Sequence, residues 1–219
     1  MTSPVGPGQT TKGLALRSFQ RLQRLHFQNP RAASAAIMVA SVDPFTLTVG
    51  NFLTLLTLAT QKFVYGRRIT MTLNDASGND LAVRVLIKGI RWGRPQQEQL
   101  TVTCTTTNDT VGTTALVYDQ LTSVQLQSIT GSSSGDALTM GWDGTTLGLP
   151  FPVDSLADVF SITAINNGTE QTPTVVSTTT FDVADSAVIG LTIAATQQFV
   201  VDCLVGRDDD GIGFGGEFR

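Results

Sequence analysis

Threonine is the residue that most constrains the fold of this chain. It supplies 32 of the 219 residues, and most of them alternate with Val, Leu, Ile or Phe. Thr is β-branched, and its methyl and hydroxyl groups suit a strand face that is half wet and half covered. Groups that transfer protons are scarce, with three Lys, three Glu and one His. The composition predicts an all-β protein and favours binding or scaffolding over catalysis.

Charge is unevenly distributed along the chain. Residues 1–42 carry five basic side chains and no acid, while the whole chain has a net charge of −4, so the remainder carries −9. A basic segment on an acidic body can dock on that body, on a neighbouring copy, on another acidic protein or on nucleic acid. We expect a basic arm over residues 1–36, a β-sandwich body over 37–206 and a Gly-rich acidic tail over 207–219.

Residues 14–28 form the one amphipathic helix that the pattern predicts. Apolar residues recur there at spacings of three and four beside a stripe of arginines, and Asn29-Pro30 follows. So short a helix is marginal alone and must bury its apolar face on another surface. The candidate partner-binding residues of the arm are Arg17, Phe19, Arg21, Leu22, Arg24 and Leu25.

Strand-like runs separated by turn-forming residues fill the rest of the chain. We expect residues 67–73 and 81–91 to form one hairpin, and 98–106 and 115–129 a second. Further strands are predicted at 137–142, 159–165, 174–181, 188–194 and 199–205. Short strands at this spacing without intervening helices indicate an antiparallel sandwich or a barrel-like body.

Catalytic and metal-binding patterns are weak. His26, the only histidine, lies in the basic arm, far in sequence from Cys104 and Cys203, so a nucleophile and base are not paired by the sequence. Both cysteines lie in strand-like runs and are expected to be buried free thiols. No pair stands out among the acids that would serve a glycosidase, Glu98, Asp119, Asp143 and Asp154. We predict no enzymatic activity, no cofactor and no metal.

The C-terminal tail has two features of its own. A run of three acids, Asp208–Asp210, precedes a glycine. Such a run either binds calcium or forms a solvated acidic tail, and the spacing of an EF-hand loop is missing here. Phe214 and Phe218 are expected to anchor the tail on a neighbouring surface. Asn108 and Asn167 begin glycosylation sequons that also read as ordinary turns.

The stretch 98–152 resembles a known class of protein. It contains EQLTVTCTTT, LTSVQLQSITGSSSGDALTMGW and DGTTLGLPFP. This order is similar to the β-rich capsid cement or decoration proteins of tailed bacteriophages. The resemblance extends to a closing loop whose residues either cap the core or meet a partner: Gly141, Trp142, Gly144, Leu147, Gly148, Leu149 and Pro150.

The resemblance implies a structural virion protein that binds the outer surface of an icosahedral head and joins neighbouring major capsid subunits. We expect it to be made in the host cytoplasm, to form a dimer or trimer, and to contact neither membrane nor nucleic acid directly. The alternatives are a head-to-tail adaptor or tail protein and, from another class, a carbohydrate-binding β module. The longest apolar run of the body, 52–59, is too short to span a bilayer.

Overall fold

The structure is a computed structural model that describes residues 21–28, 33–76, 80–105, 109–131, 135–193 and 197–205. These residues form mostly antiparallel β structure without a closed barrel, which confirms the predicted all-β, sandwich-like class. The chain divides into two compact units. Unit 1 combines Met1–Asn29, Phe151–Ser186 and Thr196–Arg219, and unit 2 combines Pro30–Pro150 and Ala187–Ala195.

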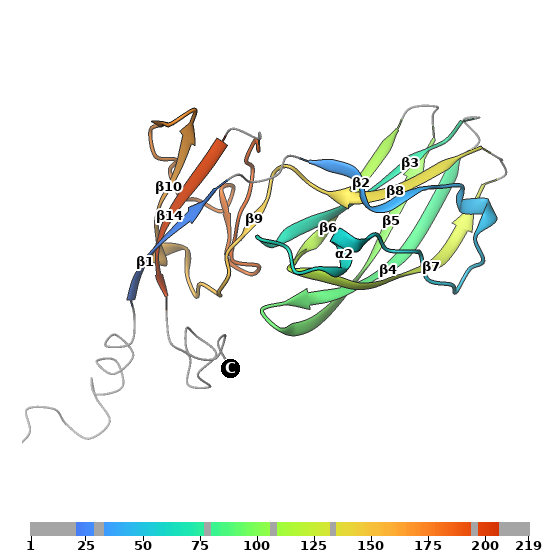
Figure 1. Ribbon diagram of the computed structural model, residues 1–219, viewed down its shortest axis with the longest axis horizontal. Coiled ribbons are helices and arrows are strands. Elements are labelled where there is room, and N and C mark those ends of the chain that lie inside the picture. Colours follow the sequence, from blue (N-terminus) through green and yellow to red (C-terminus); the bar gives the residue numbers. More distant parts are fainter. Residues whose placement is uncertain are drawn as a thin grey trace, which may run out of the picture. The chain divides into compact units, whose positions relative to one another are not determined.

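Two sheets make up the body of unit 2 (Figure 1). One has the order β2 (Ser34–Val42), β8 (Ala137–Trp142), β3 (Arg67–Asn74) and β6 (Thr110–Tyr118). The other has the order β5 (Arg94–Cys104), β4 (Leu81–Arg91) and β7 (Gln120–Thr130). The short strands β9 (Leu147–Gly148) and β13 (Ala187–Val188) pair antiparallel, and η1 (Pro44–Thr46) and α2 (Thr57–Thr60) lie between β2 and β3.

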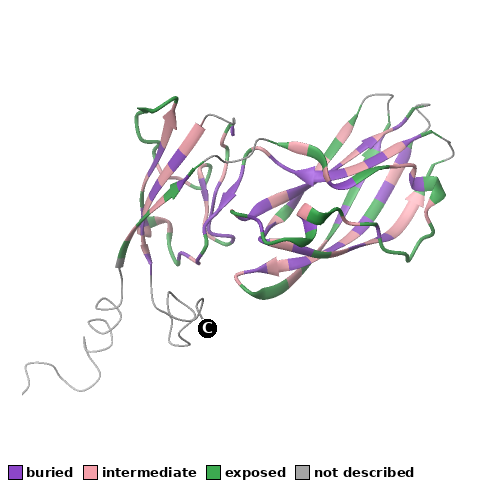
Figure 2. Cartoon of the chain, in the orientation of Figure 1, coloured by how far each residue is buried: buried purple, intermediate pink, exposed green. Residues whose placement is uncertain are grey.

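Alternating side chains from both sheets fill the core of unit 2. On β4 every second residue is buried, and Val83, Val85 and Ile87 have no exposed surface. Their counterparts on β3, Ile69 and Met71, are equally buried. Figure 2 shows this alternation as bands along the strands. A period of two is what a strand requires when only one of its faces meets the core.

The segment between η1 and α2 links the two sheets of unit 2. Its backbone amides at Gly50 and Leu53 donate to Leu126 O and Val124 O of β7, each at 2.8 Å. Farther on, Leu56 N donates to Met38 O of β2 at 2.8 Å. The segment thus satisfies part of the outer edge of β7, which would otherwise present unpaired backbone groups.

Unit 1 contains a four-stranded sheet with the order β1 (Arg21–Phe27), β14 (Gln197–Val205), β10 (Val159–Asn166) and β11 (Thr169–Glu170). It also holds η2 (Leu156–Asp158) and β12 (Phe181–Asp182). On β14 the residues Phe199, Val201, Cys203 and Val205 are buried, and those between them are partly exposed. The outer face of this sheet is mixed in character, because it carries the Arg24–Asp202 pair together with Val200 and the exposed Leu22.

The predicted helix over residues 14–28 is wrong from Arg21 onward, because residues 21–27 form β1 and pair with β14 over seven consecutive positions. The spacing of Leu22 and Leu25 fits a helix, but their neighbours also fit a period of two. Pairing with β14 satisfies the backbone and buries Phe27, whereas a short helix would be marginal. Residues 21–27 therefore belong to unit 1 and not to a separate arm, and residues 14–20 lie outside the described part.

Both predicted hairpins are also wrong. The strand β3 pairs with β6 and β8, while β4 pairs with β5 and β7, so the turn formers at 74–80 mark a crossing from one sheet to the other. Likewise β5 and β6 belong to different sheets, and Asp119 divides the predicted strand 115–129 in two. Turn-forming residues show where a chain changes direction, but they do not specify which strand it then pairs with.

One hairpin that does form joins β4 to β5 through Trp92 and Gly93, whose φ angles are +49° and +77°, and another joins β10 to β11 through Asn167 and Gly168. Two-residue hairpins need positive φ, which glycine adopts readily and tryptophan does not. The strands predicted at 137–142, 159–165 and 199–205 correspond to β8, β10 and β14. The single body predicted over 37–206 is divided between the two units. Among the described residues, most of the strands predicted at 174–181 and 188–194 are absent, and residue 194 lies outside the described part.

Candidate functional site

Three of the four carboxylates that would serve a glycosidase have other partners, and the fourth, Asp154, is exposed. Both oxygens of Glu98 accept hydrogen bonds from backbone amides of β6, from Ala115 N at 2.8 Å and Leu116 N at 3.0 Å. These amides lie where the pairing of β3 with β6 shifts register, so Glu98 satisfies donors that the bulge leaves over. Asp143 Oδ2 accepts from the hydroxyls of Thr145 and Thr146 at 2.6 and 2.7 Å. These two carboxylates thus have structural roles.

Asp119 pairs with a buried arginine. Arg91 Nη1 donates to Asp119 Oδ1 at 2.5 Å, and Trp92 N donates to Asp119 Oδ2 at 2.8 Å. The Arg91 guanidinium also stacks on the Trp92 ring at 4.2 Å from its centroid, and the Trp92 indole donates to Leu149 O at 3.0 Å. These contacts offset the unfavourable positive φ of Trp92 and hold the hairpin turn in one conformation.

Two glycines make room for Arg91. A Cβ added to Gly66 would overlap Arg91 Nη1, and one added to Gly148 would lie 2.8 Å from Arg91 Nη2. The two glycines are themselves bridged, since Gly148 N donates to Gly66 O at 2.8 Å. The backbone at these two positions can therefore approach the guanidinium more closely than any other residue would allow.

A second arginine is buried in unit 2. Arg67 is only 3% exposed, donates from Nη1 to Thr146 O at 3.1 Å and lies 5.7 Å from the centroid of the Trp142 ring. Burial lowers the pKa of Arg67 to about 10, although Asp143 and Tyr65 oppose this shift. Arg67 remains charged at neutral pH. We call Arg67, Arg91, Asp119 and Asp143 the buried charge cluster.

The loop on which the resemblance rests is an interior element. Trp142 belongs to the core of unit 2 and meets the Phe63 ring edge to face, with the centroids 5.7 Å apart. Leu147, Gly148 and Leu149 are buried, and a Cβ on Gly141 would collide with the backbone of Ser34. Gly144 has little room beside Ala33, and only Pro150 is exposed. These residues cap the core rather than display side chains to a partner.

The candidate arm residues do not form one apolar stripe. Leu22 and Leu25 lie on opposite faces of β1, and Leu22 is 65% exposed while Leu25 is partly covered. Arg24 forms an ion pair with Asp202 of β14 at 2.7 Å. The hydrogen bond from Arg24 holds the pKa of Asp202 below its usual value, and Asp202 raises the pKa of Arg24. Arg17, Phe19 and the tail anchors Phe214 and Phe218 lie outside the described residues.

A groove of about 450 Å³, with both polar and apolar side chains in its lining, lies on the outer face of the sheet in unit 1. It contains His26 and Ser161, but these side chains are engaged separately: Ser161 Oγ donates to Asp202 at 3.0 Å, and His26 Nε2 lies 2.7 Å from Gln198 Oε1. A nucleophilic serine needs a base within hydrogen-bond reach. The groove therefore does not have the contacts of a catalytic triad.

Metal and thiol chemistry have little material in the described part of the chain. No three His, Cys, Asp or Glu side chains gather there in a way that could hold an ion. Cys104 and Cys203 are buried free thiols, as predicted, and burial raises the pKa of Cys203 to about 12. The Asp208–Asp210 run lies outside the described residues. Asn167 begins the turn between β10 and β11 with φ +50°, as the turn reading of its sequon predicts, and Asn108 is not described.

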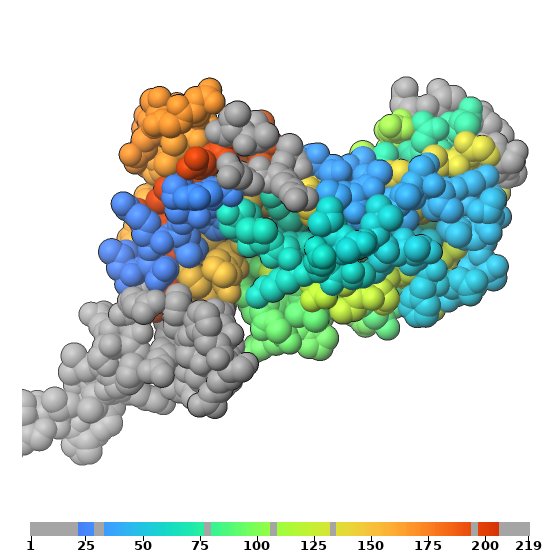
Figure 3. Space-filling model, viewed as in Figure 1, coloured from blue at the N-terminus to red at the C-terminus, as the bar shows by residue number. Residues whose placement is uncertain are grey.

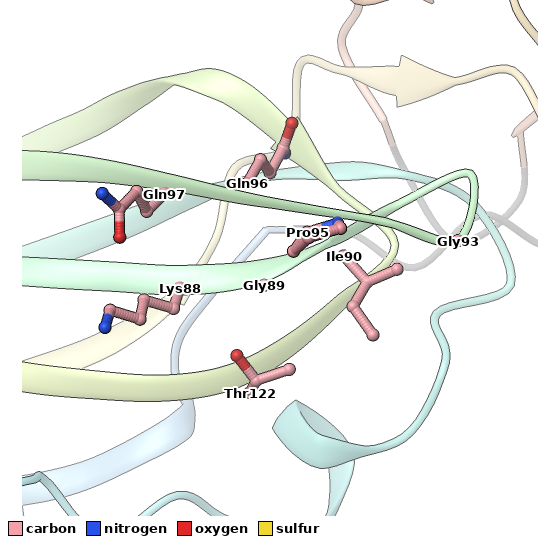
Figure 4. Close-up of a pocket in the computed structure, with 8 residues that line it drawn as sticks. All are labelled: Lys88, Gly89, Ile90, Gly93, Pro95, Gln96, Gln97 and Thr122. Carbon is pink, nitrogen blue, oxygen red and sulfur yellow. The ribbon is translucent and has the colours of Figure 1, made fainter.

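A second pocket, of about 330 Å³, opens on the outer face of the β5–β4–β7 sheet in unit 2 (Figure 4). Lys88 and Gln97 are paired across β4 and β5, and Thr122 comes from the adjacent part of β7. Ile90 and Pro95, which are also paired, supply its apolar side. This pocket was not predicted from the sequence.

The sequence did carry one unused signal for the buried charge cluster. Arg91 continues the alternation of Leu81, Val83, Val85 and Ile87, so the period of two places it on the inward face of β4. A charged residue at an inward position needs a partner. The identity of that partner, Asp119, depends on the fold.

Among the described residues, no helix combines the length and the apolar character that crossing a membrane would require. Comparisons with protein-family models, with curated proteins and with solved structures found no match for this chain.

Proposed function

We propose that this chain is a structural virion protein that binds the outer surface of an icosahedral phage head and joins neighbouring major capsid subunits. The observation that carries the proposal is that the chain forms two compact β units, each with exposed large apolar side chains. In unit 1 these include Leu22, Phe160 and Val175, and in unit 2 they include Val49, Phe52 and Val64. A protein that joins two subunits needs two such surfaces.

The apolar side chains of unit 2 are presented by a fixed backbone. Val49 and Phe52 are 53% and 62% exposed, and the adjacent residues Gly50 and Leu53 hold this part of the chain to β7 by backbone hydrogen bonds. Figure 3 shows the segment as blue and cyan atoms on the visible face of unit 2. Little conformational entropy is lost when side chains on a fixed backbone meet a partner, so more of the contact energy appears as affinity.

Two linked surfaces also explain how weak contacts can suffice. When one unit is bound, the other is held near its own site, and the overall affinity can exceed that of either unit by about 10²–10⁴. The resemblance of residues 98–152 to capsid cement proteins favours a viral shell as the partner. The excess of basic residues over 1–42 favours an acidic surface on that shell.

Co-sedimentation with shells assembled from the major capsid subunit of the encoding virus tests the proposal. We expect the chain to bind such shells, and Phe52→Asp or Phe160→Asp to weaken binding by roughly tenfold each, because each removes an exposed apolar side chain. Thr54→Asp adds the same charge on the same segment without removing an apolar side chain and is the matched control. Absence of binding to intact shells would refute the proposal, and binding confined to one vertex would favour the adaptor alternative.

A further inference from the structure

The outer face of the β5–β4–β7 sheet differs in charge from the rest of this acidic protein. The three strands carry a single acid, Glu98, and its carboxylate is bound to the backbone of β6. Their outward positions hold Arg84 and Lys88 among Gln, Thr and Ser side chains. The face thus combines positive charge with hydrogen-bonding groups and has no competing carboxylate of its own.

Three polar side chains of the pocket on this face have unused bonding capacity. In the part of the chain that the structure describes, the side chains of Lys88, Gln97 and Thr122 form no hydrogen bond or ion pair. Figure 4 shows Lys88 between Gln97 and Thr122, with Pro95 and Ile90 farther toward the hairpin turn. The pocket therefore offers an ammonium, an amide and a hydroxyl beside an apolar surface. Its volume of about 330 Å³ falls in the range of small-ligand sites.

We propose that this pocket binds a saccharide that carries a carboxylate. Lys88 supplies one positive charge for the carboxylate, Gln97 and Thr122 exchange hydrogen bonds with hydroxyl groups, and the Pro95 and Ile90 side chains cover the apolar face of the sugar ring. Sites for phosphate usually use bidentate arginines or a row of free backbone amides. Within the pocket lining the only cation is the Lys88 ammonium, which matches one carboxylate, and the amides of the central strand are committed to the sheet.

Arg84 extends the site. It lies four residues before Lys88 on the same face of β4, which places the two positions roughly 13 Å apart along a strand. An acidic polysaccharide with repeated carboxylates could form ion pairs with both Lys88 and Arg84. A neutral polysaccharide could form an ion pair with neither. The pocket does not depend on the proposed role on a capsid, because neither Val49 nor Phe52 lines it, although Phe52 bridges to Gln125 of β7 and so lies at the edge of the same sheet.

Isothermal titration calorimetry on the full chain tests this site with three probes: a hyaluronan hexasaccharide, neutral dextran and a short single-stranded DNA. We expect the hexasaccharide to bind, dextran to give no heat, and DNA to bind more weakly than the hexasaccharide. Lys88→Gln should weaken hexasaccharide binding about tenfold, as expected for the loss of a charge-assisted hydrogen bond. Gln97→Ala should weaken it to a smaller extent.

Lys62→Gln is the matched control, because Lys62 is another exposed lysine of unit 2, its substitution removes the same charge, and it does not line the pocket. It should leave binding unchanged, and all variants should keep the melting temperature of the parent chain. The proposal is overturned if the hexasaccharide does not bind at millimolar concentration, if Lys88→Gln binds as well as the parent, or if DNA binds as tightly as the saccharide. It is also overturned if Lys88→Gln abolishes self-association instead, since the face would then be an interface between copies.

Discussion

The buried ion pair of unit 2 gives the most demanding prediction. Asp119→Ala removes the acceptor of Arg91 Nη1 and of Trp92 N, and it leaves a guanidinium that is 3% exposed without its carboxylate. Breaking a buried pair from one side costs about 3–5 kcal/mol. A domain is typically stable by about 5–15 kcal/mol, so we expect Asp119→Ala to remove a large part of the stability of unit 2.

Tryptophan fluorescence during urea unfolding measures this loss selectively. Both tryptophans of the chain, Trp92 and Trp142, belong to unit 2, so their emission reports on that unit alone. We expect the midpoint of the transition to fall sharply for Asp119→Ala. Arg84→Met is the control, because Arg84 is an exposed arginine on the same strand and its loss should change stability by less than about 0.5 kcal/mol.

A double variant separates the ion pair from general damage. When Arg91→Met is combined with Asp119→Asn, neither member of the pair is charged, and the new side-chain amide at position 119 still offers an oxygen to the backbone amide of Trp92. We expect this double variant to be more stable than Asp119→Ala, with a coupling energy of at least about 1.5 kcal/mol between the two sites. A loss below about 1 kcal/mol for Asp119→Ala, or additive effects of the two substitutions, would refute the reasoning.

Four further outcomes follow from single contacts. Gly148→Ala should destabilise unit 2 by about 1–3 kcal/mol in the same fluorescence assay, because the new methyl overlaps the Arg91 guanidinium; an unchanged midpoint would contradict this. Glu98→Ala should cost about 1–3 kcal/mol by orphaning two amides of β6, and Glu98→Gln should cost less, so equal losses would speak against the contact. The pKa of Asp202 is lowered in the folded state, so the stability that Asp202 contributes is present above pH 3.8, its usual pKa, and is lost as the pH falls below that value. Hydrogen exchange of β1 amides should accelerate over that pH range in the parent chain and should change less in Arg24→Gln. Cys203, whose pKa is raised to about 12, should resist iodoacetamide at pH 8 in the folded chain and react in urea, and rapid labelling of the native thiol would show that it is not buried.

Local chemistry determined the class of this protein. The alternation of Thr with branched apolar residues specifies strands wherever one face is buried and the other is wet, and β8, β10 and β14 lie where that alternation predicts them. Burial of the two cysteines follows from the same pattern. A period of two is a property of each strand by itself, so the sequence suffices to recognise it.

Pairing and partners were decided only by the tertiary structure. Residues 21–27 are compatible with a helix and with a strand, and the free edge of β14 selects the strand. The chain passes from β3 in one sheet to β4 in the other. Which strand β4 pairs with depends on contacts between residues far apart in sequence, and no local pattern encodes those contacts. In the same way, the alternation predicts the inward position of Arg91. Its partner carboxylate, Asp119, and the space left by Gly66 and Gly148 exist only once three separate segments have been brought together.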